Sequence, residues 1–182
     1  MLIFYFCIYK TIRLSPTIPL SSTMNSINDV ADYIILKVKS EDKTASLINL
    51  KLQKLLYYVQ AWSYGINQKP MFQGDFEAWI HGPVNRNIYN RFSSTKYLYS
   101  EINITDCLNK NVKLPDEDAE FIDFILENYS KYSGAELERL SHNEMPWLKT
   151  RGNLGVNERC NKVISPELMK KYYGEKWKEI NS

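Results

Sequence analysis

The residues that could perform acid–base or metal chemistry are few, because the chain has only two histidines, His81 and His142. His142 and Glu144 have the H-x-E spacing of zinc deaminases, but the P-C-x-x-C that completes such a metal site is absent. His81 could instead work with Glu77 as an acid–base pair, since both can approach one surface around a bend at Gly82. A histidine beside Gly-Pro more often fixes the turn through a backbone hydrogen bond. A hydrolase or transferase that uses His81/Glu77 or His142/Glu144 stays open as an alternative.

Sequence patterns of other catalytic and cofactor-binding classes are missing. The sequence contains no G-x-S-x-G nucleophile turn and no glycine-rich phosphate loop. Its three cysteines, Cys7, Cys107 and Cys160, are far apart and form no CxxC pair, which argues against a disulfide framework and a zinc site. The sequence therefore predicts a protein that is not an enzyme and has no cofactor or metal, and reduced thiols fit the cytoplasm best.

The charge is balanced in number but uneven along the chain. A net charge of +2 arises from 23 basic and 21 acidic side chains, whereas nucleic-acid binding usually requires a concentrated basic face. Residues 115–127 are acidic, and the chain from Lys149 onward is mostly basic. Solvated faces explain most such runs, so contact with nucleic acid is not expected. A DNA-binding autoregulator nevertheless remains a second alternative.

The first 23 residues differ from the rest of the chain. A mostly apolar run over residues 2–9 precedes Lys10 and Arg13. A secretory signal has its positive charge before the apolar stretch, and a membrane-spanning helix needs about 20 apolar residues. We therefore interpret residues 1–23 as a non-native or disordered extension, with a short membrane-surface anchor as the alternative. Residues 24–182 are expected to form a single domain without membrane contact.

Apolar side chains at intervals of three and four residues predict two helices in the first third of the domain. One covers residues 28–39, and the other, over residues 50–64, is predicted to lie at the centre of the core. Asn49 is expected to cap this central helix, and Gly65 to end it in a left-handed turn.

Proline and serine residues mark further helix starts. The predicted helices run from Pro83 to about Phe92, from Pro115 onward, from Ser133 to about His142, and from Ser165 to about Gly174. Between them, residues 76–80 favour a short strand or a bend, residues 93–114 one or two short strands or an extended loop, and residues 144–152 a turn. The predicted fold class is therefore mainly α (α+β), a compact helical domain with a small central β element.

Three stretches in this order resemble the Panacea-domain family, which includes SocA-like antitoxins and phage-associated GepA-like proteins. They are LKLQKLLYYVQAWSYG at 50–65, FEAWIHGPVNRNIYNRF at 76–92 and LSHNEMPW at 140–147. The resemblance extends from about residue 28 to residue 147, and more loosely to residue 173. It implies a mostly helical fold with a small β element and a non-enzymatic role as the antitoxin of a toxin–antitoxin system.

The same resemblance implies a cognate protein toxin as partner, usually encoded by the adjacent gene and neutralised by direct binding. It also suggests a role as a proteolytic adaptor that delivers the toxin to a ClpXP-type protease. The family positions carried over to this sequence are predicted to be mostly structural. They are Gln53, Lys54, Tyr57, Tyr58, Trp79, Gly82, Pro83, Tyr89, His142, Glu144, Pro146 and Trp147.

A surface for the partner is predicted beside the Gly82–Pro83 bend. Its polar residues are His81, Asn85, Arg86 and Asn87, which we expect to point outward on the way into the following helix. His81 stands where the family commonly has tyrosine, which weakens the hypothesis of a catalytic histidine at this position.

Overall fold

A computed structural model of the chain describes residues 24–41, 45–155 and 157–182. The prediction for residues 1–23 lies outside the described residues. Within the described ranges, no helix combines the length and the apolar character needed to cross a membrane.

The described chain is mainly α-helical, as predicted. Its α-helices are α2 (Ile27–Glu41), α3 (Asn49–Trp62), α4 (Arg86–Phe92), α5 (Asp116–Tyr129), α6 (Gly134–His142), α7 (Met145–Arg151) and α8 (Pro166–Ile180). A π-helical turn, η1 (Ser63–Asn67), continues α3, and a short 3₁₀ helix, η2 (Ile104–Asp106), lies in the long segment between α4 and α5. Strands β1 (Glu77–Trp79) and β2 (Gly82–Val84) form a small antiparallel hairpin.

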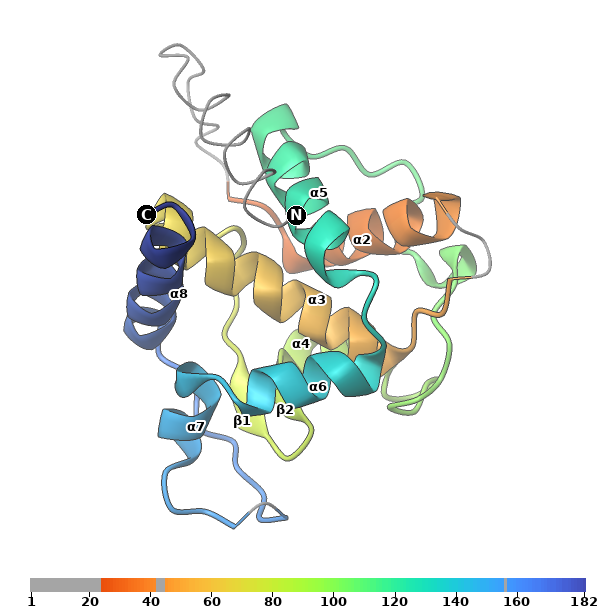
Figure 1. Cartoon of the computed structure of the whole chain (residues 1–182). Helices are drawn as coiled ribbons and strands as arrows, with labels where there is room; N and C mark the ends of the chain where they lie inside the picture. Colours follow the sequence, from red (N-terminus) through yellow and green to blue (C-terminus); the bar gives the residue numbers. More distant parts are fainter. Residues whose placement is uncertain (1–23, 42–44, 156) are drawn as a thin grey trace.

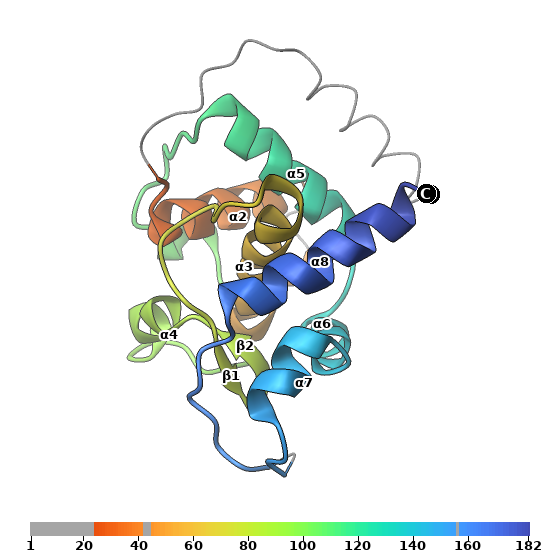
Figure 2. The ribbon, with the colours of Figure 1, turned by 90° about the vertical axis from the view of Figure 1, so that its left-hand side faces the viewer.

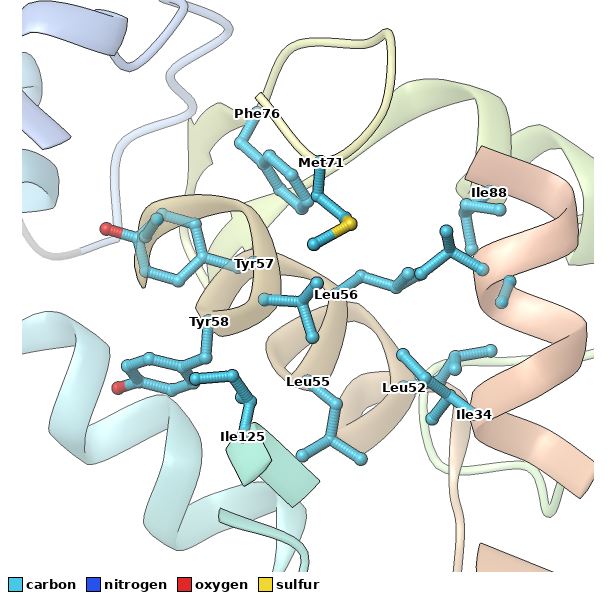
Figure 3. Close-up of a cluster of buried hydrophobic side chains, with 14 of the residues drawn as sticks. Ile34, Leu52, Leu55, Leu56, Tyr57, Tyr58, Met71, Phe76, Ile88 and Ile125 are labelled. Atoms are coloured by element: carbon cyan, nitrogen blue, oxygen red, sulfur yellow. The ribbon is translucent and has the colours of Figure 1, made fainter. Parts of the chain in front are cut away.

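Helix α3 is the centre of the core, as its apolar pattern predicts. All fourteen of its residues are buried. Helices α2, α5, α6 and α8 contact it from different sides, and the hairpin lies near its first half (Figures 1 and 2). Side chains leave α3 in several directions, with Leu52 near Ile34 of α2 and Tyr58 near Ile125 of α5 (Figure 3). Each fully buried leucine contributes about 1.5–3 kcal/mol through removal from water, so this helix organises most of the apolar core.

Several predicted helix starts are confirmed by their capping hydrogen bonds. Ser133 accepts from the Glu136 backbone N–H while the Glu136 carboxylate accepts from the Ser133 N–H, which is a capping box. Ser165 caps α8, and three acidic residues occupy the first turn of α5, where the helix dipole favours them. The predicted cap at Asn49 is wrong. Ile48 occupies the cap position, and Asn49 lies buried in the first turn of α3.

Two glycine predictions are also wrong, because neither Gly65 nor Gly174 ends a helix where expected. Gly65 lies inside η1, where a Cβ atom would be 2.6 Å from Tyr173 Cβ. Gly174 does not end α8, which continues to Ile180, and a Cβ there would lie 3.5 Å from the Gly65 carbonyl oxygen. The left-handed residue after η1 is Gln68, with φ of 59°. The absence of a side chain at Gly65 lets α8 approach η1 directly, whereas a Cβ at Gly174 would make an ordinary van der Waals contact.

The helix predicted from Pro83 begins three residues later than expected. Gly82 and Pro83 belong to β2, whose register pairs Trp79 with Gly82 and Ala78 with Pro83. In this register the nitrogen of Pro83 points away from β1, so its missing N–H removes no ladder hydrogen bond. Asn85 caps α4 by accepting from the backbone N–H groups of Asn87 and Ile88.

Of two other segments, one matches an alternative of its prediction and the other does not. Residues 93–114 form the extended-loop alternative, with a single bridge between Ile48 and Glu101 and the short η2. Residues 145–151 form helix α7 where a turn was predicted, because Pro146 suits a first helical turn.

The contact between η1 and α8 gives a stability prediction. Gly65→Ala places a methyl group against the Tyr173 backbone and Cβ, so we expect a loss of about 1–3 kcal/mol in the free energy of unfolding. Urea denaturation measures it. Gly155→Ala is the matched control, because its new Cβ would meet nothing closer than 3.6 Å. Equal stability of the two variants would show that α8 does not pack as described.

Candidate partner-binding site

The three sequence blocks of the resemblance meet in space around the hairpin. The first lies on α3, the second forms the hairpin and α4, and the third spans α6 and the start of α7. Both views place α6 and α7 beside β1 and β2 (Figures 1 and 2). The residues in these blocks therefore position a common region.

Gln53 on α3 binds the end of β2 as a neighbouring strand would. Its amide nitrogen donates to the Asn85 carbonyl oxygen at 3.3 Å, and its amide oxygen accepts from the Asn85 backbone N–H at 2.9 Å. All of these groups are buried. Since an unsatisfied buried backbone group costs about 1–3 kcal/mol, the glutamine stabilises the hairpin end at a fixed distance from α3.

Lys54 makes the adjacent contact from the same helix. Its Nζ donates to the Pro83 carbonyl oxygen at 3.0 Å, and its side chain has no exposed surface. Burial lowers the pKa of Lys54 to about 7, although the nearby Glu138 carboxylate acts in the opposite direction. The amine can therefore be held as a neutral hydrogen-bond donor at moderate pH.

Gly82 is required where Lys54, the hairpin and α6 meet. Its φ is +86°, a conformation that favours glycine. A Cβ atom there would also lie 2.7 Å from Lys54 Cε and 2.8 Å from Ser141 Oγ. The glycine thus serves both the turn and the close approach of the lysine.

An aromatic cluster with one buried carboxylate joins α3 to α8. Tyr57 packs edge-on against Phe76 and Tyr173, with centroid distances of 5.5 and 6.3 Å. The Tyr173 hydroxyl donates to Glu144 at 2.6 Å, and Lys176 donates to the same carboxylate at 3.1 Å. Burial raises the pKa of Glu144, which the Lys176 charge partly offsets.

The third block fixes the opposite side of the hairpin. Trp147 Nε1 donates to the Trp79 carbonyl oxygen at 3.0 Å, and the His142 ring stacks on Trp147 with centroids 4.1 Å apart. Partial burial lowers the pKa of His142. Tyr58 also faces inward and stacks on Tyr129. Most of the twelve family positions therefore contact the interior, whereas Trp79 and Tyr89 reach the surface.

The geometry does not bring the two proposed acid–base pairs together. Glu77 accepts hydrogen bonds from Arg86 and from Trp79 Nε1, and these contacts lower its pKa. His81 instead has Nδ1 3.0 Å from the Glu138 carboxylate. In the third block, His142 stacks on a tryptophan while Glu144 faces Tyr173. Among the residues that the structure describes, no group of three or more His, Cys, Asp or Glu side chains could hold a metal ion.

Three of the four residues predicted for the partner surface are exposed. His81, Arg86 and Asn87 face solvent. Asn85 does not, so its predicted outward orientation is wrong. Its side chain is buried because it caps α4 and donates to the Asp75 carbonyl oxygen.

The exposed part of the hairpin is hollowed on both sides of an aromatic pair. Trp79 and Tyr89 meet edge-to-face, with centroids 4.8 Å apart, and the Arg86 guanidinium lies 5.2 Å from the Trp79 ring centroid. We call the surface formed by Trp79, His81, Arg86, Asn87 and Tyr89 the hairpin face. One adjoining pocket of about 430 Å³ also contains Arg159, Cys160 and Asn161. Another, of about 340 Å³, contains Lys96, Tyr97 and Leu98.

Sequence reasoning missed Arg159 and Tyr97 as neighbours of this face. Arg159 is about seventy positions from the hairpin in sequence and reaches it because residues 162–164 pair with β1. Tyr97 follows α4 in a loop that contains turns, and a tyrosine-rich sequence alone could not predict that its side chain is 87% exposed.

Comparison with known proteins identifies the family of this chain. The family model described as "Antitoxin SocA-like, Panacea domain" matches residues 52–148, which include all three blocks apart from the first two residues of the first. The chain belongs to this family.

A curated member, Antitoxin SocA of Caulobacter vibrioides (strain NA1000 / CB15N), is 33% identical over 159 residues. The alignment covers 80% of the present chain and 85% of the relative. The search of solved structures found no significant match. Family membership supports an antitoxin role and a toxin as the general class of partner.

The buried Lys54 gives a pH-dependent prediction. Its folded pKa lies below its unfolded value, so the unfolded chain binds more protons above about pH 7. The free energy of unfolding of the unaltered protein should therefore rise relative to Lys54→Met, by up to about 1.4 kcal/mol per pH unit between pH 7 and 10.

Denaturation at several pH values measures this difference, and the exposed Lys171→Met is the matched control for loss of a lysine. Parallel stability curves for the unaltered protein and Lys54→Met would contradict the buried position of the amine.

Proposed function

We propose that this chain neutralises a cognate protein toxin by binding it directly through the hairpin face, and that the adjacent gene encodes the toxin. Family membership supports the antitoxin role. The observation that carries the choice of surface is the pair of half-buried Trp79 and exposed Tyr89, with Arg86 beside it and a pocket on each side. Aromatic residues and arginine contribute most of the binding energy at protein interfaces.

The hairpin face is held in place before any partner arrives. Arg86 makes two hydrogen bonds to Glu77, at 2.8 and 2.6 Å, and Trp79 donates to the same carboxylate. Beneath them, Gln53 and Lys54 fix β2 to the central helix. Ordering flexible side chains weakens binding by about 0.5–1.5 kcal/mol each, so a preformed face supports tight association.

The DNA-binding alternative has less support from the geometry. Part of the basic C-terminal region is used inside the protein. Arg151 is buried and donates to the Ala78 carbonyl oxygen, and Lys176 pairs with Glu144. These side chains are therefore not available to neutralise phosphates, which is the main source of affinity for nucleic acid. We propose a protein partner in the cytoplasm instead.

Delivery of the toxin to a ClpXP-type protease is compatible with the same surface. An adaptor holds its cargo through one surface and leaves another for the protease, and the hairpin lies on the opposite side of α3 from α5 (Figures 1 and 2). A toxin half-life that shortens only when both this chain and the protease are present would support delivery. An unchanged half-life during neutralisation would favour masking.

Tyr97 lines a pocket that adjoins the hairpin face and provides a test of partner binding there. Its ring is almost fully exposed, so Tyr97→Ala should leave stability unchanged but raise the Kd for the adjacent gene product at least about tenfold. Calorimetry with the purified product measures the Kd, and co-expression measures growth rescue.

Tyr99→Ala is the matched control, because Tyr99 is in the same segment but lines a different pocket, beside residues 130–136. If Tyr99→Ala weakens binding and Tyr97→Ala does not, the toxin binds elsewhere.

A further inference from the structure

The small sheet has a third segment that no sequence pattern indicated. The Ala78 N–H donates to the Lys162 carbonyl oxygen at 3.0 Å, and the Ile164 N–H donates to the Phe76 carbonyl oxygen at 2.7 Å. These bonds place Val163 opposite Glu77 in an antiparallel bridge. The segment before α8 accordingly runs beside β1 (Figure 2), and the order across the sheet is β2, β1 and then residues 162–164.

The two edges of this sheet differ. At β2, Gln53 binds the backbone N–H and C=O of Asn85, and Lys54 binds the Pro83 carbonyl oxygen. Pro83 also has no N–H to offer, so side chains from α3 close this edge. No comparable cover is found at the edge formed by residues 161–163 within the described chain, and these three residues are exposed.

The backbone of Val163 points toward the open side. In an antiparallel ladder, a residue flanked by the two bonds described above directs its own N–H and C=O away from the neighbouring strand. No described residue hydrogen-bonds to either group of Val163, and its side chain is 47% exposed. No hydrogen bond to the backbone N–H or C=O of Asn161 is found in the described chain either. The edge thus offers a template for one further strand.

Charge indicates which strand would fit this template. Arg159 and Lys162 flank the edge, are exposed, and form no ion pair with any described residue. The neighbouring Glu158 carboxylate does not pair with them and accepts instead from the Gly155 N–H at 3.0 Å. Arg159 also shares its pocket with Arg86 of the hairpin face. A second copy of this basic segment would place like charges together, whereas an acidic segment would pair with them.

We propose that an extended acidic segment of the protein partner adds to this sheet as a strand along Asn161–Val163, with its carboxylates against Arg159 and Lys162. This inference rests on the proposed function and deepens it, because it specifies how the partner binds beside the hairpin face. The main chain supplies affinity, and the flanking charges supply the preference for an acidic sequence.

The experiment uses the full chain and the purified adjacent gene product as probe. Val163→Pro removes the outward N–H while tolerating extended backbone, so the Kd should rise at least about tenfold. Val163→Ala keeps the N–H and should raise the Kd at most about threefold. Arg159→Glu with Lys162→Glu should raise the Kd at least about tenfold and reduce its dependence on salt, whereas Lys170→Glu with Lys171→Glu on α8 is the matched control.

Circular dichroism verifies that each variant is folded, and if Val163→Pro is not folded the double charge reversal decides alone. Unchanged binding by the folded proline variant or by the Arg159/Lys162 variant overturns strand addition and leaves the antitoxin proposal intact. If the Arg159/Lys162 variant loses binding to duplex DNA but not to the protein probe, strand addition is also overturned. If the unaltered chain binds no product of an adjacent gene, both proposals fail.

Discussion

The structure depends on one requirement. The polar side chains along a helix that is buried on all sides must find hydrogen-bond partners. Helix α3 carries Gln53, Lys54 and Gln60 into the interior, where an unpaired polar group costs several kcal/mol. Each binds the backbone of a nearby non-helical segment. Gln53 and Lys54 bind β2, and Gln60 binds Met71 and Phe72. The helix therefore determines where the connecting segments lie as well as where the apolar core forms.

This constraint explains why the hairpin is ordered despite its size. An isolated hairpin of three-residue strands is marginal in water. Here β2 is bound by α3, β1 is bound by residues 162–164, and the Trp79 carbonyl is held by Trp147. The exposed face with Trp79, Arg86 and Tyr89 therefore rests on interactions from three distant parts of the chain. Most of the family positions lie in this support, so they specify the scaffold more than the partner.

The sequence predicted the elements well where one local signal has one meaning. The apolar spacing of α3 and the reciprocal Ser133 and Glu136 pattern are of this kind. Predictions failed where one residue type serves two purposes. Gly65 could permit a left-handed turn or a close helix contact, and Pro83 could start a helix or lie on a strand with its nitrogen outward.

The candidate site was predicted only in part, again because one residue type can serve two purposes. His81, Arg86 and Asn87 are exposed as expected, but Asn85 is buried by its capping role. The neighbours Tyr97 and Arg159 come from segments whose path only tertiary pairing determines. No local pattern could have assigned residues 162–164 to the sheet, because a single bridge leaves no alternation to detect.

The central claim is that a side-chain amide of α3 replaces a neighbouring strand at the edge of β2. Amide hydrogen exchange in Gln53→Leu, followed by NMR, tests it most directly. Exchange at Asn85, which is bonded to Gln53, should accelerate strongly, while exchange at Ala78, which is bonded to Lys162, should stay protected. Unchanged protection at Asn85 would contradict the account.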